Sequence, residues 1–324
     1  MDTLLDTIKK NRSVRASTLD EYKRSLNTLS NVITENKFQN IDFILDKKED
    51  IGKFLQTKSN SLQKKYLSAI LVALSPKGKN QAQEKNNKVY NFYLSLLNTK
   101  NQEYLNGISN NKKSDKDKEK WTTWQSILDV NKSLKKQILA KGIKLNNPQF
   151  KNAKESFLLQ DYVISSLYTM LPPRRLDYGD ANIISKKDFD RLAETAKNDN
   201  VYLVDESNKN KYFSFGKNAI KSETKENIKI DIPKDLNSVL NGWLKVNNTK
   251  NLLVNKKYER LGKNALSKQL SNIFDATGKK LSVVMLRKIY LTDKFGDIKK
   301  EMDETAEAMN HSAGVAQKVY IKMD

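Results

Sequence analysis

Hydrophobic residues in the first third of the chain recur at helical spacing. The capping-box pattern Ser17–Asp20 precedes a stretch in which apolar side chains return every three or four positions. The same spacing recurs around residues 46–55, 61–74 and 89–97. The pattern predicts four short helices that pack as a small bundle over residues 1–105.

Residues 106–120 interrupt this hydrophobic pattern. Asn106–Gly107 is a turn signal, and the stretch 110–118 consists of Asn, Lys, Ser and Asp residues. We interpret 106–120 as a linker. It separates the helical unit of residues 1–105 from a second unit of residues 121–324.

The second unit mixes two periodicities. Phe157–Met170 is an apolar helical stretch that ends at Pro172–Pro173. Everything after Pro233 has a helical pattern, with breaks expected near Gly278 and Gly296. Between them, three short runs rich in β-branched and aromatic residues predict strands at 201–204, 212–215 and 228–232. The predicted fold class is therefore mainly α with a small antiparallel β-sheet.

The net charge adds a class of partner to this picture. The 324 residues include 59 Lys and Arg against 38 Asp and Glu, a formal charge of +21. Such an excess indicates a polyanionic partner, nucleic acid or an anionic membrane face, although abundant Lys and Asn also fit a bias toward A-rich codons. Residues 1–110 contribute +7 and residues 111–324 contribute +14. Basic charge is thus shared by both units, which is the distribution expected if both contact one nucleic-acid duplex.

Several classes of protein are excluded by what the chain lacks. It has no Cys, which excludes disulfides, thiolate zinc sites and a cysteine nucleophile. Its single His excludes a catalytic zinc held by several histidines. The longest apolar run, Ala69–Leu74, is far shorter than a membrane span, and Met1–Arg15 has no signal-peptide core. We expect a soluble intracellular protein with no membrane partner and no cofactor or metal.

Residues suited to phosphoryl-transfer chemistry occur in a particular order in the second unit. An arginine pair follows the two prolines, lysines lie between the second and third predicted strands, and an arginine, the single histidine and a tyrosine follow near the C-terminus. In chain order these candidates are Arg174, Arg175, Lys217, Lys225, Arg287, His311 and Tyr320.

This order of Arg, Lys, Arg, His and Tyr resembles the tyrosine recombinases, the lambda-integrase family of DNA breaking-rejoining enzymes. The run Pro172–Tyr178, Pro-Pro-Arg-Arg-Leu-Asp-Tyr, is most similar to integrases carried by large DNA viruses and their parasites. The resemblance covers residues 118–324, and the predicted helical bundle fits the SAM-like core-binding domain of the family. It implies a DNA-clamp domain followed by a tyrosine-recombinase catalytic domain.

The resemblance also implies a role for each residue type. Tyr320 would be the nucleophile that forms a 3′-phosphotyrosine link. Arg287, a second arginine and His311 would stabilise the negative charge that builds up on the phosphoryl oxygens. A lysine in the hairpin would protonate the leaving 5′-oxygen. This chemistry needs neither a metal ion nor ATP.

Two of these assignments stay open. The first arginine is Arg174 or Arg175, and Asp177 favours Arg174 because the family often has an acid three residues after that arginine. Asp177 would then orient the arginine. The lysine is Lys225 or Lys217, and the run from Lys225 to Pro233 resembles the lysine-bearing strand of the family, which favours Lys225.

Two features depart from the family pattern. Val284 stands where many members have a His, three residues before the second arginine, and Lys288 is a candidate substitute for it. Only residues 321–324 follow Tyr320, whereas many relatives have a longer tail that docks on the neighbouring protomer. We therefore expect that this contact is made in another way, that the chain is truncated, or that the tyrosine helix itself is exchanged between protomers.

Each candidate also has a simpler interpretation. A tyrosine or histidine near a C-terminus is usually a packing or surface residue, an arginine pair can end a helix, and lysines abound in this hairpin. The three tryptophans are more typical of a core than of base stacking; they are Trp121, Trp124 and Trp243. Only the ordered set favours a catalytic role.

The expected function is a site-specific DNA recombinase or integrase that acts as a homotetramer on two double-stranded DNA sites. Its compartment would be the nucleus or a viral replication compartment of a host cell, or the cytoplasm of a prokaryote. One alternative is a type IB topoisomerase, which uses the same chemistry as a monomer, but viral members of this size begin with a β-rich domain. Another is a catalytically degenerate DNA-binding relative, a possibility that Val284 leaves open.

Overall fold

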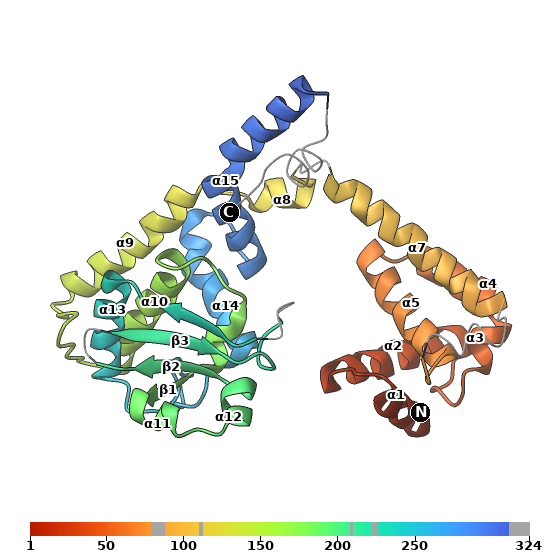
Figure 1. Cartoon of the computed structure of the whole chain (residues 1–324), viewed down its shortest axis with the longest axis horizontal. Coiled ribbons are helices and arrows are strands. Elements are labelled where there is room, and N and C mark those ends of the chain that lie inside the picture. Colours follow the sequence, from red (N-terminus) through yellow and green to blue (C-terminus); the bar gives the residue numbers. More distant parts are fainter. Residues whose placement is uncertain (79–87, 110–112, 208–209, 222–225, 311–324) are drawn as a thin grey trace. The chain divides into compact units, whose positions relative to one another are not determined.

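The chain is mainly helical (64%) and carries one small mixed sheet of four strands. A computed structural model describes residues 1–78, 88–109, 113–207, 210–221 and 226–310. The chain divides into two compact units, Met1–Lys112 and Lys113–Asp324 (Figure 1).

The first unit is built from helices throughout its described residues. They are α1 (Asp2–Asn11), α2 (Ala16–Thr34), α3 (Asp42–Asp46), α4 (Lys48–Gln56), α5 (Asn60–Leu74) and α7 (Lys88–Ser109). The four predicted helices correspond to α2, α4, α5 and α7. The additional helices α1 and α3 were missed. Helix α3 has only five residues, whereas α1 has ten and carries Leu4 and Ile8 one turn apart.

Helix α5 is the central element of this unit, because α1, α2, α4 and α7 all pack against it. Leu67, Ile70 and Tyr93 are buried in the shared core.

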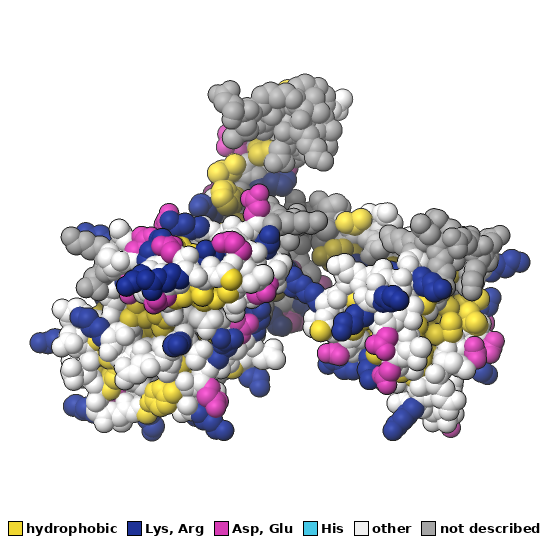
Figure 2. Space-filling view, turned by 60° about the horizontal axis from the view of Figure 1, so that its bottom comes forward, with side chains coloured by type: hydrophobic (Ala, Val, Ile, Leu, Met, Phe, Trp, Pro, Cys, Tyr) yellow, Lys and Arg dark blue, Asp and Glu magenta, His cyan; other side chains and the backbone are white. Residues whose placement is uncertain are grey.

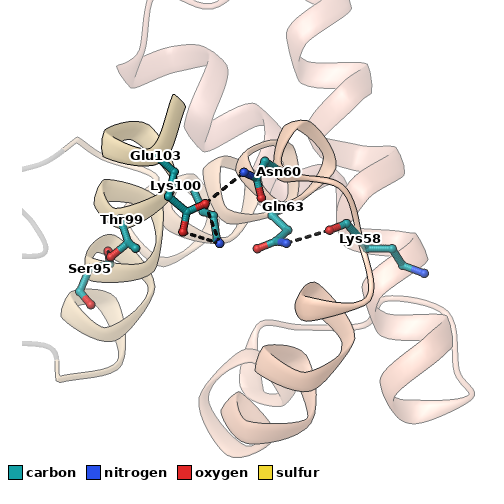
Figure 3. Close-up of polar contacts among 7 residues, drawn as sticks. All are labelled: Lys58, Asn60, Gln63, Ser95, Thr99, Lys100 and Glu103. Atoms are coloured by element: carbon teal, nitrogen blue, oxygen red, sulfur yellow. Dashed lines mark hydrogen bonds and ion pairs between the residues drawn. The ribbon is translucent and has the colours of Figure 1, made fainter. Parts of the chain in front are cut away.

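Polar contacts join the N-terminus of α5 to α7 (Figure 3). Asn60 Nδ2 donates to Glu103 Oε2 at 3.0 Å, and Lys100 Nζ lies 2.8 Å from Glu103 Oε1. The hydrogen bond from Lys100 holds the pKa of Glu103 below its usual value.

The boundary between the units lies in a stretch that is largely helical. Within the range 106–120 that we expected to be a linker, α7 continues to Ser109 and α8 covers Asp115–Lys120. Ser114 caps α8 by accepting from the Asp117 amide at 3.2 Å, and Lys118 pairs with Asp115 at 2.9 Å. Alternating charges predicted solvated coil, but their spacing also allows these short-range pairs along a helix.

The second unit contains the sheet and the remaining helices. These helices are α8, α9 (Trp124–Ala140), α10 (Ala153–Thr169), η1 (Leu176–Asp180), α11 (Lys186–Asp190), α12 (Glu194–Asp199), α13 (Lys234–Leu244), α14 (Gly262–Phe274), η2 (Asp275–Thr277) and α15 (Val283–Ala308). No helix in the described part of the chain is long and apolar enough to cross a bilayer.

The sheet has the strand order β1-β2-β3-β4. The strands are β1 (Asn182–Ser185), β2 (Val201–Asp205), β3 (Lys211–Phe215) and β4 (Ile228–Asp231). The pattern-based prediction of β2, β3 and β4 is confirmed, and these three strands pair antiparallel. Strand β1 was missed, and because it pairs parallel to β2 the sheet is mixed rather than purely antiparallel. Only two of its four residues are apolar, and they are adjacent, so the sequence shows no alternation that would predict a strand.

The two faces of the sheet serve separate cores. Leu203, Phe213 and Phe215 point into the main core of the unit. On the other face, Tyr202 and Val204 pack in a smaller cluster with residues of α11. This alternation follows from the two-residue period of a strand.

The tryptophans belong to the main core, as expected. Trp124 and Trp243 are buried there, and Trp121 packs against it. Trp243 Nε1 also donates to the Leu252 carbonyl at 2.7 Å. All three tryptophans lie in the second unit, so their fluorescence reports on that unit alone.

Helix α15 continues through Gly296, where we expected a break. This glycine does not adopt a left-handed conformation, whereas Gly278 does, with φ +73°, and ends η2 as expected. Beyond Gly296 the helix is supported by ion pairs one turn apart, Lys299 with Asp303 and Lys300 with Glu304. A single glycine weakens a helix by about 1 kcal/mol but does not end it unless the next residues turn away.

A matched pair of glycine substitutions tests the packing of this unit. A Cβ at Gly242 in α13 would collide with the carbonyl oxygen of Leu145, whereas a Cβ at Gly296 would meet only Thr292 Cγ2 at 3.6 Å. We predict that Gly242→Ala lowers the free energy of unfolding by about 1–3 kcal/mol. Gly296→Ala should raise helix stability by about 1 kcal/mol. Urea unfolding followed by tryptophan fluorescence and far-UV circular dichroism measures both, and equal effects of the two variants would contradict the packing described.

Candidate active site: the arginine turn beside strand β3

The arginine pair lies where an apolar helix is forced to stop. Helix α10 ends at Thr169 with Met170 as its C-cap, and Pro172 and Pro173 cannot continue it because proline lacks the amide donor. The chain leaves the helix in extended form and enters the short helix η1 at Leu176. This places two consecutive guanidinium groups at the edge of the main core.

Arg174 is held in a half-buried position by two neighbours. Its Cζ lies 3.8 Å from the centre of the Phe215 ring, and its Nη2 lies 3.5 Å from Asp177 Oδ2. The side chain is 19% exposed and that of Asp177 is 8% exposed. Asp177 lies beside Arg174, as the resemblance to the tyrosine recombinases led us to expect. A guanidinium over an aromatic face with a buried carboxylate beside it is fixed in orientation.

Most of the hydrogen-bonding capacity of Arg174 is unused within the described residues. Its Nε is buried and has no hydrogen-bond partner there. The 3.5 Å contact to Asp177 uses one of the five N–H groups of the guanidinium. A buried donor without a partner is costly, and a bound ligand is one way of satisfying it. The ligand that suits a fork of N–H donors is a phosphate or carboxylate.

The Arg175 side chain is exposed, and it donates a hydrogen bond to a backbone carbonyl rather than to another side chain. Its Nη1 donates to the carbonyl oxygen of Lys221 at 2.6 Å. Its own carbonyl accepts from the hydroxyl of Tyr168, on α10, at 2.8 Å. Arg175 therefore links the end of α10 to the loop that follows β3.

The first residues of the loop after β3 are fixed by close packing and hydrogen bonds. A Cβ at Gly216 would collide with the carbonyl oxygens of Lys197 and Asn198, so only glycine fits this approach. The amide of Lys217 donates to Asn227 Oδ1 at 2.8 Å. The Lys217 side chain is exposed beyond this anchored backbone. The structure thus brings Lys217 to the same end of β3 as Phe215 and the segment Pro172–Arg175, which we call the arginine turn.

A cluster of buried aromatic rings packs next to the arginine turn. The Tyr178 ring lies 5.5 Å from Tyr168, 5.0 Å from Phe213 and 5.9 Å from Phe215. Burial raises the pKa of the Tyr168 and Tyr178 phenols well above their usual value near ~10. Both phenols therefore stay neutral at physiological pH, and Tyr168 remains a hydrogen-bond donor.

Arg287 is half-buried in the second turn of α15. The apolar side chains around it, Met285, Leu286 and Ile289, are buried in the main core and fix this part of the helix. Its guanidinium has neither a hydrogen bond nor an ion pair with another described residue. Among the described residues, no hydrogen bond or ion pair links Arg287 to Arg174 or Arg175.

Lys288, the candidate substitute for the histidine that the resemblance expects at position 284, forms an ion pair with Asp117. Val284 is exposed, and Lys288 Nζ lies 2.7 Å and 2.9 Å from the two carboxylate oxygens of Asp117. This hydrogen bond holds the pKa of Asp117 below its usual value. Lys288 therefore joins α15 to α8, which is a structural role.

Three candidates, Lys225, His311 and Tyr320, lie outside the described residues. The structure brings Arg174, Arg175 and Lys217 to one region, and Arg287 lies on α15. In the described residues, no group of three or more His, Asp or Glu side chains could hold a metal ion.

Two contributors to this region were not recognised from the sequence. Phe215 carries the Arg174 guanidinium, and Tyr168 holds the backbone of Arg175. The signal for Phe215 was its position at the end of a predicted strand, two residues before Lys217. No spacing rule identifies Tyr168, because its role depends on the turn made by the two prolines.

Comparison with known proteins adds no assignment. No family model, curated protein or solved structure matches the chain.

Two tyrosine-to-phenylalanine variants test how the arginine turn is supported. Tyr168→Phe removes the hydrogen bond to the Arg175 carbonyl, and we predict a loss of about 1 kcal/mol in the free energy of unfolding. The Tyr178 hydroxyl is buried with no hydrogen-bond partner among the described residues, so Tyr178→Phe should change stability by less than about 0.5 kcal/mol or increase it. Urea unfolding measures both. A larger loss for Tyr178→Phe would show that its hydroxyl has a partner and that this description is wrong.

Proposed function

We propose that the chain is a tyrosine-recombinase-type enzyme that cleaves and rejoins duplex DNA through a covalent 3′-phosphotyrosine intermediate. The observation that carries the proposal is the Arg174 guanidinium, oriented by Asp177 and Phe215 with its remaining donors unused in the described structure. It occurs at the first position of the ordered set that ends in His311 and Tyr320.

In the proposed reaction, the Tyr320 hydroxyl gives up its proton to solvent, and its oxygen attacks the phosphorus of one phosphodiester. The bond between phosphorus and the 5′-oxygen breaks as the new bond forms, and the 5′-oxygen leaves as a hydroxyl after it receives a proton. Lys225 or Lys217 supplies this proton. Attack by a 5′-hydroxyl on the phosphotyrosine link reverses the steps and rejoins a strand, so no external energy source is consumed.

The arginines act on charge rather than on protons. Negative charge grows on the two non-bridging oxygens of the phosphate as Tyr320 attacks. A preoriented guanidinium stabilises that charge without the cost of reorganising solvent. We assign this role to Arg174 and Arg287, with His311 as a further donor. Arg175 positions the lysine-bearing loop through its bond to the Lys221 carbonyl.

Both units are proposed to contact DNA. The first 110 residues carry +7 and the rest carry +14, and phosphate neutralisation by Lys and Arg supplies most sequence-independent affinity. Lys and Arg side chains are spread over the surfaces of both units (Figure 2). Recombination of two sites would require a homotetramer, with one subunit on each half-site, in the nucleus, a viral replication compartment or a prokaryotic cytoplasm.

Two other functions compete with this proposal. A type IB topoisomerase would use the same residues as a monomer, and the helical character of the described residues of the first unit favours the recombinase. A catalytically degenerate relative would still bind DNA through its net positive charge but would not cleave it. Two observations support this second alternative. Val284 replaces a histidine that many tyrosine recombinases have, and Lys288, its candidate substitute, is paired with Asp117.

Covalent capture of DNA by Tyr320 separates these functions. The full chain is incubated with supercoiled plasmid and with a pool of nicked duplexes of random sequence, and adducts are detected after denaturation in SDS. We predict an adduct that disappears in Tyr320→Phe, because the phenol oxygen forms the bond. Tyr290→Phe on α15 is the matched control and should leave the adduct unchanged.

The outcomes discriminate among the three functions. DNA binding without any adduct identifies the degenerate relative. Relaxation of plasmid of any sequence by a monomer identifies the topoisomerase. Full adduct formation by Tyr320→Phe would show that the nucleophile has been assigned to the wrong residue.

A pair of charge-conserving variants distinguishes the two arginines. Arg174→Lys keeps the charge but loses the planar fork over Phe215, and we predict a ~10²–10³-fold slower cleavage. Arg175→Lys should slow cleavage by no more than ~10-fold, because Arg175 acts through a loop backbone. Single-turnover cleavage rates and duplex affinity are measured for both. The reverse order of the two effects would transfer the catalytic assignment to Arg175.

A further inference from the structure

Helix α15 carries an exposed apolar stripe beyond the part that packs in the core. Its first turns bury Leu286 and Ile289 in the main core. Between residues 291 and 310 almost every side chain is exposed, apart from the buried Ala306, and the helix projects from the body of the second unit (Figure 1). The exposed large apolar residues on it are Val284 (56%), Leu291 (51%), Phe295 (45%) and Ile298 (55%), followed by Met309 (54%) at its C-cap.

These residues lie on one narrow line along the helix. Leu291, Phe295, Ile298 and the half-buried Met302 are separated alternately by four and three positions. At 100° per residue they occupy a band about 60° wide. This is the seam of a two-stranded coiled coil rather than the wider face with which a helix covers a globular core. Hydrophobic side chains are visible on this helix in Figure 2.

A projecting helix of this length needs a partner for its stripe. Residues 291–308 extend roughly 27 Å at 1.5 Å per residue. Most helices in proteins gain their stability by burying an apolar face rather than from intrinsic helix propensity. Gly296 in the middle weakens the helix further. The stripe is therefore the part of α15 that a partner would cover.

The charges on α15 indicate what that partner is. Residues 283–296 carry a net charge of +2, and residues 297–308 carry −3. A second copy of the same helix in the opposite direction would place each basic half beside an acidic half. A copy in the same direction would place like charges together. The helix is thus complementary to itself only when antiparallel.

Two residues beside the stripe sharpen this argument. Lys294 and Glu301 lie on the same flank of the seam, one heptad apart. Neither has an ion-pair partner among the described residues, although Lys299 and Lys300 each have one within the helix. Lys294 instead lies near the rings of Tyr290 and Phe295. Both charges remain available for a partner.

We propose that α15 pairs with α15 of a second copy in an antiparallel two-helix seam, which makes the free protein a dimer. Phe295 packs against Ile298 of the second copy, and Leu291 packs against Met302. In this register Lys294 faces Glu301 of the second copy, and two-fold symmetry makes the same pair twice. In a parallel seam Lys294 would instead face Lys299, which repels it. The pairing needs no DNA and is independent of the proposed chemistry.

The oligomeric state of the full chain tests the proposal. Sedimentation equilibrium without DNA should show a monomer that converts to a dimer, with half-assembly at ~10–100 µM because the interface is small. Phe295→Asp should keep the protein monomeric throughout this range. Leu139→Asp alters an equally exposed apolar residue on α9 and should leave assembly unchanged. Circular dichroism and tryptophan fluorescence confirm that each variant is folded.

Charge reversal decides the direction of the two helices. Lys294→Glu places two acids together in the antiparallel seam and should weaken the dimer at least ~10-fold, whereas it would strengthen a parallel one. The double variant Lys294→Glu with Glu301→Lys restores both pairs and should recover the affinity of the original chain. A concentration-independent monomer would overturn the proposal. So would a dimer that Phe295→Asp leaves intact, or one that Lys294→Glu strengthens.

Discussion

The position of Arg174 depends on one constraint, which is that a guanidinium cannot lose its charge when it is half-buried. Its desolvation must be offset by a carboxylate and an aromatic face, and here these are Asp177 and Phe215. Phe215 is fixed in turn by ring contacts with Phe213 and Tyr178. The candidate site is therefore an extension of the aromatic core, and its accuracy depends on how well that core packs.

The same constraint organises the elements around the arginine turn. The prolines end α10, Tyr168 ties the following backbone to that helix, and Arg175 ties it to the loop after β3. Gly216 lets that loop start in contact with the backbone of residues 197 and 198. A rigid guanidinium thus stands beside a lysine-bearing loop that is anchored at its base. This combination suits a reaction that needs fixed charge stabilisation and a proton donor brought close to it.

Helix α15 combines two environments in one continuous element. Its first turns are fixed by the core and by the pair between Lys288 and Asp117, and they carry Arg287. Its later turns are exposed and carry the coiled-coil stripe. Because a helix is stiff over this length, assembly through the stripe would also position the segment that holds Arg287 relative to a second copy.

The sequence alone determined the local features of this protein. Periodicity identified the helices around residues 19–33 and 157–170 and the three antiparallel strands, because these elements repeat their apolar positions over several turns or strand residues. The resemblance to the tyrosine recombinases, which often have an acid three residues after the first arginine, implied that Asp177 orients Arg174. The helical nature of 115–120 and the continuity of α15 through Gly296 were missed, because charge patterns and a lone glycine are compatible with either state.

Only the tertiary structure decided which distant residues meet. Strand β1, the stacking of Arg174 on Phe215 and the bond from Tyr168 to Arg175 depend on contacts between elements, which no short window of sequence encodes. The same holds for Lys288, whose partner Asp117 lies 171 residues earlier. The order of Arg, Lys, Arg, His and Tyr was legible in the sequence because it reflects residue type. The neighbours that orient Arg174 were not, because orientation is set by packing.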